Sequence, residues 1–197
     1  MGGLDSWLRG SEALEMEEPG TQNDWSLVRG TLAGRRQDFM ALVEKHQRPL
    51  QRFVEQRVGD RAAADEIVQM TFVQAYTHLA GFRAESSFKT WIFSVALNLC
   101  RDRARAEKRR ANVTAEEVLE KEPQAGPSLE ETVLGGTVER RVAALPDRQR
   151  SVLGLRIWGD LSFREIGRML GISENSAKVS YHHAIHRLRQ WLGEERA

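Results

Sequence analysis

The last third of the chain contains a short helix, a glycine turn and a second, longer helix. Residues 161–170 have helical periodicity, Ser162 is a suitable N-cap, and Glu165 three residues later completes a capping box. Gly171 can adopt the left-handed conformation that ends this helix, and Ser173 can cap the next one. Two helices joined by so tight a turn are typical of a helix-turn-helix.

The second helix of this pair has an apolar face and a polar, cationic face. The apolar stripe consists of Ala177, Tyr181, Ala184, Ile185, Leu188 and Leu192. The opposite face carries Asn175, Val179, His182 and His186, flanked by Lys178 and Arg189. Such a helix suits the major groove of DNA, although an ordinary helical hairpin with a solvated face would show the same pattern. Gly167 is expected where a side chain would hold the two helices apart.

Helical periodicity also runs through most of the chain before this motif, and strand signals are almost absent. Helices are predicted from about Trp25 to His46, after Pro49 to Val58, from Arg61 to Leu79, and from Ser87 onward. The last of these continues without a break into the cationic run from Arg101 to Arg105. The sequence therefore predicts an all-α protein.

Composition divides the chain into two small helical domains. Residues 1–24 are predicted to form an acidic, flexible N-terminal arm. Residues 111–136 are rich in Glu, with Pro and Gly, and cannot bury much apolar area, so they are expected to form a flexible acidic linker. The helical domains are then residues 25–110 and 137–197. The formal net charge of +1 conceals this separation of acidic and basic segments.

The sequence lacks the residue patterns that are typical of enzymes. It contains no phosphate-binding glycine loop, no nucleophile elbow and no spaced set of Cys and His. His182 and His186 share a face without an evident third ligand, so no metal or cofactor is predicted. A single cysteine, Cys100, fits a reducing cytoplasm. No segment approaches the roughly 18 apolar residues that a membrane span needs, so no membrane insertion is expected.

The segment from Phe82 to Arg105 carries a second signal for nucleic-acid binding. It combines aromatic side chains, small hydroxyls and the start of a cationic helix. Aromatic and hydroxyl groups can stack on and hydrogen-bond unpaired bases, while Arg and Lys neutralise phosphates. Phe88 and Trp91 fit the apolar stripe of the helix and are assigned to the core. The loop from Phe82 to Ser87 is expected to be free to bind a base.

Both modules resemble one family, the bacterial sigma-70 RNA polymerase sigma factors, and within it the extracytoplasmic-function (ECF) group. Residues 65–72, Asp-Glu-Ile-Val-Gln-Met-Thr-Phe, resemble the region 2 helix that binds the clamp helices of RNA polymerase. Residues 82–92 are similar to the family's −10 segment. Residues 145–150 resemble the start of region 4, and residues 161–188 resemble its −35 helix-turn-helix. The modules stand in the family's order around a linker.

The resemblance implies three sets of site residues. Polymerase binding is assigned to Asp65, Glu66, Gln69 and Phe72. Contact with the −10 element is assigned to Phe82, Arg83, Ser86, Ser87, Lys89, Asn98, Arg101 and Arg105. Contact with the −35 element is assigned to Arg164, Ser173, Glu174, Asn175, Ser176, Lys178, Val179, His182, His183, His186 and Arg187. At two positions where the family's recognition helix commonly has arginine, this chain has Ser180 and His183. The resemblance therefore does not imply which −35 sequence is recognised.

The implied function is that of an ECF sigma factor and not of an enzyme. Such a protein binds core RNA polymerase through the β′ clamp helices and the β flap, recognises −35 and −10 promoter elements, and initiates transcription in response to an envelope or environmental stress signal. Residues 25–110 would be region 2 and residues 137–197 region 4. Core polymerase and promoter DNA are the expected partners, and an anti-sigma factor is a further candidate. The alternative is a helix-turn-helix regulator that acts without stable polymerase binding.

Overall fold

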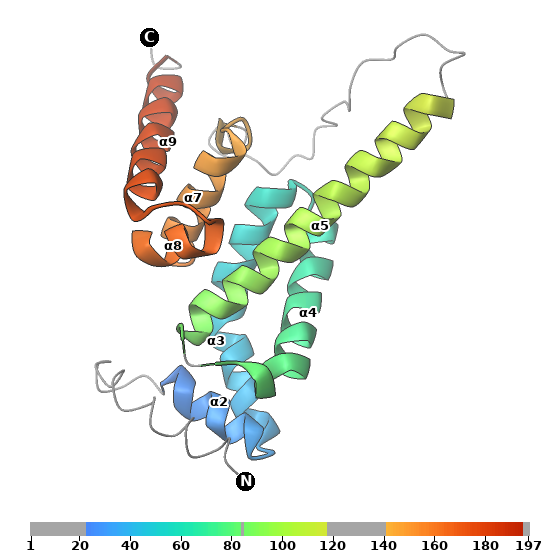
Figure 1. Cartoon of the computed structure of the whole chain (residues 1–197), viewed down its shortest axis with the longest axis vertical. Helices are drawn as coiled ribbons and strands as arrows, with labels where there is room; N and C mark the ends of the chain where they lie inside the picture. The colour runs from blue at the N-terminus through green and yellow to red at the C-terminus, as the bar shows by residue number, and fades with distance from the viewer. Residues whose placement is uncertain (1–22, 84, 118–140, 195–197) are drawn as a thin grey trace.

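The computed structural model describes residues 23–83, 85–117 and 141–194, which are built from helices (Figure 1). The N-terminal domain contains α2 (Asp24–Leu32), α3 (Arg36–Val58), α4 (Arg61–His78), the 3-10 turn η1 (Leu79–Gly81) and α5 (Phe88–Glu117). The C-terminal domain contains α7 (Asp147–Ile157), α8 (Phe163–Leu170) and α9 (Glu174–Glu194). No strand occurs among these described residues, and the prediction of an all-α fold is confirmed.

Helix α2 begins earlier than the sequence suggested. The side chain of Asn23 accepts a hydrogen bond from the backbone N–H of Trp25 and caps the helix, whose first residue is Asp24. Asp24 pairs with Lys45 and with His46 of α3, each at 2.8 Å. The predicted arm therefore does not extend to residue 24, because these contacts hold its last two residues in the fold. Residues 1–22 lie outside the described residues.

Helix α3 runs through Pro49, and the predicted break at this proline was wrong. Proline removes one backbone hydrogen bond from a helix interior. The face of α3 on either side of Pro49 is nevertheless buried, with Leu42 and Leu50 both fully inaccessible to solvent. This packing outweighs the local cost. The chain breaks instead before α3, where Gly34 has a φ of 90°.

The core of the N-terminal domain lies where α3, α4 and α5 meet. Its largest fully buried side chains include Leu42, Leu50, Phe53, Leu79, Phe88, Ile92, Phe93 and Leu97. Most of these come from the apolar stripes of α3 and α5, since residues three and four apart share one helix face. The core also contains Phe88, as the sequence predicted.

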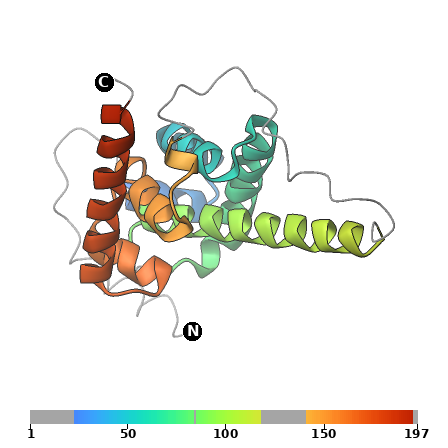
Figure 2. The same cartoon turned by 90° about the horizontal axis from the view of Figure 1, so that it is seen from above.

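Helix α5 is 30 residues long and projects beyond the rest of the molecule (Figure 2). Its backbone continues to Glu117, so the prediction that a flexible linker begins at Ala111 was wrong for residues 111–117. These residues extend a helix that is already nucleated, and adding a turn to an existing helix is much easier than starting one. Residues 118–136 of the predicted linker lie outside the described residues.

The C-terminal domain packs against the N-terminal domain. A small cluster of its own contains Val142, Leu145, Leu153 and Ala184, with Ile185, Leu188 and Trp191 packed against it. Val152, Leu155, Leu161, Ile166 and Ala177 instead belong to the same buried cluster as the core of α3 and α5. Figures 1 and 2 place α7–α9 beside the first half of α5, away from α4. The two predicted domains therefore share an apolar contact.

We predict that Asp24→Asn lowers the stability of the protein at neutral pH. Burial alone would raise the pKa of Asp24, but the hydrogen bond and charge of His46, followed by those of Lys45, outweigh it and lower this pKa. A carboxylate with a lowered pKa stabilises the fold fully above its unfolded pKa of about 4, and loses that effect as the pH falls through the folded pKa. Charge-assisted hydrogen bonds of this kind contribute about 1–3 kcal/mol.

Urea unfolding of both proteins across the acidic range tests this prediction. The difference in unfolding free energy between wild type and Asp24→Asn should shrink as the pH falls below about 4. Glu44→Gln, at an exposed site on α3, is the control and should show little difference at any pH. A difference for Asp24→Asn that is constant with pH would contradict this assignment.

Candidate functional site

The helix-turn-helix has the local geometry that the sequence predicted. The Ser162 hydroxyl accepts a hydrogen bond from Glu165 N–H at 3.3 Å, and Glu165 Oε2 accepts one from Ser162 N–H at 2.8 Å. Gly171 has a φ of 69° and ends α8. A Cβ at Gly167 would lie 2.8 Å from the carbonyl oxygen of Ile172 and 3.3 Å from the Glu174 nitrogen. Only glycine therefore permits so close an approach of α8 to the start of α9.

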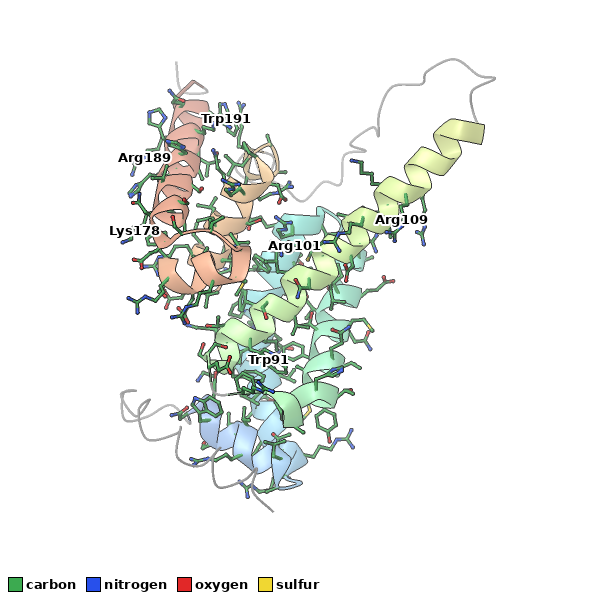
Figure 3. All side chains as sticks on the ribbon, in the orientation of Figure 1. Trp91, Arg101, Arg109, Lys178, Arg189 and Trp191 are labelled. Atoms are coloured by element: carbon green, nitrogen blue, oxygen red, sulfur yellow. The ribbon has the colours of Figure 1, made fainter. Side chains whose placement is uncertain are left out.

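Helix α9 presents a polar, cationic face to solvent. Ser173 caps the helix by accepting a hydrogen bond from Ser176 N–H at 3.0 Å. The side chains that the sequence placed on the apolar stripe are buried or half-buried wherever the structure describes them: Ala177, Tyr181, Ala184, Ile185 and Leu188. Those that it placed on the DNA face are exposed: Asn175, Lys178, Val179, His182, His183, His186 and Arg187. Figure 3 shows Lys178 and Arg189 on the outer side of α9.

Glu174 forms ion pairs with two cationic side chains, Lys178 and Arg164, near the start of α9. Its carboxylate lies 2.8 Å from Lys178 Nζ and 3.8 Å from Arg164 Nε. The hydrogen bond from Lys178, then its charge, then the more distant Arg164 lower the pKa of Glu174 despite slight desolvation. Lys178 Nζ is therefore already paired with a carboxylate in this structure.

A hollow of about 450 Å³ adjoins the same face of α9. Pro146, Arg148 and Gln149 from the start of α7 line one side, and Val179 and His183 line the other. Arg148 and Gln149 were not predicted to belong to any site. They lie in residues 145–150, and nothing in that motif indicated that the start of α7 would lie beside α9.

The start of α5 carries several of the residues predicted to contact the −10 element. The Ser87 hydroxyl accepts a hydrogen bond from Thr90 N–H at 3.0 Å and so caps the helix. Arg83 and Ser87 are exposed, and Ser86 and Lys89 are half-buried. Farther along α5, Asn98 and Arg105 are exposed and Arg101 is half-buried. In Figure 3 Arg101 and Arg109 lie along the outward part of this helix.

Phe82 is a core residue, and its predicted role as a base-binding aromatic was wrong. Its side chain is 4% exposed. The ring stacks on Trp25 with 5.2 Å between centroids and lies 4.8 Å from Trp91. The turn η1 causes this burial, because Phe82 N–H donates to the Leu79 carbonyl oxygen and the chain turns back towards α2.

Helix α4 presents a mixed acidic and apolar face. Asp65, Glu66 and Gln69 are exposed as predicted. Asp65 accepts a hydrogen bond from Gln51 of α3 at 2.7 Å, whereas Glu66 lies 3.9 Å from Arg103 of α5, so the two carboxylates point to opposite sides of α4.

Phe72 does not belong to this exposed face. It is 8% exposed and packs in the core, which corrects its assignment to polymerase binding. Met70, Val73 and Tyr76 are about half exposed instead, at 48%, 51% and 52%. These three apolar residues recur at helical spacing outside the buried stripe of α4, and this spacing is visible in the sequence.

Two family models match the chain in the order of its two domains. The model of sigma-70 region 2 matches residues 42–110, and the model of sigma-70 region 4 matches residues 142–190. Together they cover more than half of the chain. The chain belongs to the sigma-70 family of RNA polymerase sigma factors, in its ECF group. It is a transcription initiation factor and not an enzyme, and the region 2 match favours it over a regulator that does not bind polymerase.

Relatives of this sigma factor match it over most of its length. It is 29% identical to "ECF RNA polymerase sigma factor SigW" of Bacillus subtilis, over 78% of this chain and 88% of the relative. It is 28% identical to "ECF RNA polymerase sigma factor SigM" of Mycobacterium tuberculosis, over 87% and 86%.

Solved structures share its fold. CnrH, in complex with the cytosolic domain of CnrY, aligns with a TM-score of 0.64 and 24% identity, over 87% of this chain and 97% of that one. RpoE from Bartonella quintana, in complex with the anti-sigma factor NepR, aligns with a TM-score of 0.63 and 20% identity, over 79% and 97%.

Three further points from the sequence concern the reactivity of Cys100, metal binding and membrane insertion. Cys100 is buried, and desolvation raises the pKa of its thiol to about 11, so the thiol stays protonated and unreactive at neutral pH. No group of three potential metal-binding side chains occurs among these residues. None of the described helices is both long and apolar enough to cross a membrane.

We predict that Phe82→Ala destabilises region 2 by about 3–5 kcal/mol, the usual cost of removing a buried phenylalanine ring. Thermal and urea unfolding of the full chain measure this loss. The neighbouring change Arg83→Ala removes an exposed side chain and should alter stability by less than about 0.5 kcal/mol. A Phe82→Ala protein that unfolds like wild type but fails to bind promoter DNA would restore the base-binding role and contradict the core assignment.

Proposed function

We propose that this sigma factor binds polymerase, the −10 element and the −35 element through three separate surfaces on its two domains. Region 2 comprises α2–α5 and binds the polymerase clamp helices and the −10 element. Residues 137–197 form region 4 and read the −35 element through α9. Residues 118–136 link the two. The protein acts in the cytoplasm, in response to an envelope or environmental stress signal.

The exposed face of α4 is the proposed polymerase surface. Met70 and Val73 form its apolar centre, with the acidic Asp65 and Glu66 and the amide of Gln69 around them. Partly apolar interfaces with charged rims use the centre for affinity and the charges for orientation and rate of association. This arrangement suits a partner helix with apolar and cationic side chains.

The −10 site consists of Arg83, Ser86, Ser87 and Lys89 at the start of α5. The two hydroxyls can hydrogen-bond the edge of an unpaired base, and the two cations can hold the flanking phosphates. Asn98, Arg101 and Arg105 continue along the same helix and would contact adjacent phosphates. Flipping a base costs a few kcal/mol, which these contacts must offset.

Region 4 is proposed to insert α9 into the major groove of the −35 element. Asn175 and Lys178 lie near the start of the helix, from which side chains reach base edges most easily. Val179, 44% exposed, can contact a thymine methyl group. Arg164 and Arg187 are placed on phosphates, which position the protein without carrying sequence information.

An anti-sigma factor is a proposed further partner. The support comes from the fold neighbours, one of which was solved with the anti-sigma factor NepR and another with the cytosolic domain of CnrY. Neither likeness identifies the partner of this chain.

The ordered pair of sigma-70 regions carries the proposed function, and co-purification with core RNA polymerase tests it. Wild type is expected to bind core polymerase, and the double reversal Asp65→Lys with Glu66→Lys should weaken binding at least about tenfold by removing the rim charges. Glu44→Lys, which reverses a charge at an exposed position on α3, is the control. Unaltered affinity of the double variant would place the clamp contact elsewhere, and a wild type that fails to bind core polymerase would support the regulator instead.

Two single substitutions separate base contacts from phosphate contacts at the −35 element. Lys178→Ala should cost about 1–3 kcal/mol at one base pair and relax the preference there. Arg187→Ala should lower the affinity for all DNA sequences equally and make that affinity less dependent on salt concentration. Selection of −35 duplexes by each holoenzyme at several salt concentrations measures both effects. A sequence preference unchanged by Lys178→Ala would contradict its assignment to a base.

A further inference from the structure

The hollow beside the recognition helix is formed by two helices that pack on each other, α7 and the first half of α9 (Figure 1). Its volume is about 450 Å³. Arg148 of α7 lines one side, and Val179 and His183 of α9 line the other. Ser180, a small side chain that is 8% exposed, also lines the hollow and leaves it open. Side chains of α7 and α9 can therefore bind one ligand together here.

The side chains around this hollow suit an anion. Among the described residues, none of those that line it is acidic. Arg148 is exposed and forms no hydrogen bond or ion pair with another described residue. The carboxylates closest to the hollow in the sequence are paired elsewhere: Asp147 lies 2.8 Å from Arg57. Glu174 lies 2.8 Å from Lys178. An anion that entered the hollow would thus meet a cation without a competing carboxylate.

The hollow lies on one flank of the helix that is proposed to enter the major groove. With about 100° between successive residues, Asn175, Val179 and His186 point to the centre of the exposed face of α9. His183 and Arg187, one turn apart, lie on the flank nearer to α7. A helix in the major groove has a phosphate backbone along each flank. The strand on this side would pass Arg187, already placed on a phosphate, and then the hollow.

His183 differs from the arginines around it because the charge of a histidine depends on pH. Histidine ordinarily titrates near pH 6.5, whereas arginine stays charged. The charged groups on its side of α9 are Arg148 across the hollow and Arg187 one turn along the helix. Helix α8 also packs against α9, but none of its described residues lines the hollow.

A phosphate in the hollow would couple DNA binding to proton uptake. Negative charge next to an imidazole favours its protonated form. A group that binds a proton more tightly in the complex than in the free protein makes affinity rise as the pH falls.

We propose that Arg148 and His183 together bind one phosphate of the −35 DNA in this hollow, and that His183 makes −35 binding stronger at acidic pH. The proposal rests on the proposed insertion of α9 into the major groove, and it adds α7 to the −35 surface. Both side chains position the DNA without reading its sequence, because every base pair carries the same phosphate.

The affinity of the holoenzyme for a −35 duplex between pH 6 and pH 8, at constant ionic strength, tests the role of His183. The probe is the duplex that the wild-type holoenzyme selects, without a −10 element. Wild-type affinity should rise about fivefold from pH 8 to pH 6, the order expected when one histidine binds a proton together with DNA. His183→Gln should abolish this rise. His78→Gln, at an exposed position on α4, is the matched control and should retain it.

His183→Arg provides a gain of binding that a misfolded protein could not produce. A permanent positive charge at this position should give an affinity that no longer depends on pH and that matches or exceeds the wild-type value at pH 6.

Arg148→Ala tests the partner across the hollow. It should lower the affinity for all duplex sequences and reduce the slope of log affinity against log salt by about 1. Arg48→Ala, at an exposed position on α3, is the control and should change neither. If both side chains bind one phosphate, the loss of affinity in the Arg148→Ala, His183→Gln double variant at pH 6 is smaller than the product of the two single losses.

The proposal is overturned if the pH dependence survives His183→Gln, if Arg148→Ala leaves the salt slope unchanged, or if the two losses are independent at pH 6. Failure of the underlying −35 assignment has a different signature, because Lys178→Ala and Arg187→Ala would then also leave duplex binding unchanged. If those two variants act as expected and the variants of the hollow do not, α9 binds the −35 element and only the phosphate in the hollow is wrong.

Discussion

The packing of both domains of this sigma factor depends on the buried side chain of Phe53. Its ring is fully inaccessible to solvent and lies 5.4 Å from the ring of Phe93 on α5. On its other side it limits how closely α7 can approach at Gly154. One side chain of α3 is therefore part of the core of region 2 and part of the surface on which region 4 rests. This explains why the two regions share an apolar cluster although each has a core of its own.

That shared contact creates a conflict with promoter binding. Each DNA-binding surface alone is small, and high affinity comes from holding both on one promoter, where the second contact becomes effectively intramolecular. The −10 and −35 elements are separate stretches of DNA, whereas Thr90 and Glu165 hold the two domains together at 2.6 Å. On the proposed site assignments, both elements can be bound at once only with the two domains farther apart than they are in this structure.

Local rules predicted the parts of the structure that depend on a few neighbouring residues. The capping box of Ser162 and Glu165 and the left-handed turn at Gly171 follow from side-chain and backbone chemistry within one helical turn. The exposed face of α9 follows from its periodicity in the same way. These features also set the geometry of the helix that is proposed to read the −35 element, and this local geometry was predicted correctly.

The errors arose where distant packing outweighed local preference. Pro49 should break a helix, but the buried residues on either side of it keep α3 intact. Phe82 follows a turn and was expected in solvent, yet Trp25, more than fifty residues earlier, covers its ring. The contact of Arg57 with Asp147 joins residues that nothing in the sequence pairs. A single sequence carries no signal for such contacts, so the docked arrangement could not be predicted.

Energy transfer between two fluorophores tests the docking of region 4 on region 2 most directly. The labels are placed on cysteines introduced at the exposed positions Arg48 on α3 and Gln190 on α9, while the buried Cys100, with its raised pKa, does not compete for them. The docked structure predicts efficient transfer in the wild-type protein and a marked fall in an Asp147→Lys variant, which places a cation against Arg57. Transfer that is equally weak in both proteins, or equally strong in both, would contradict the docked arrangement.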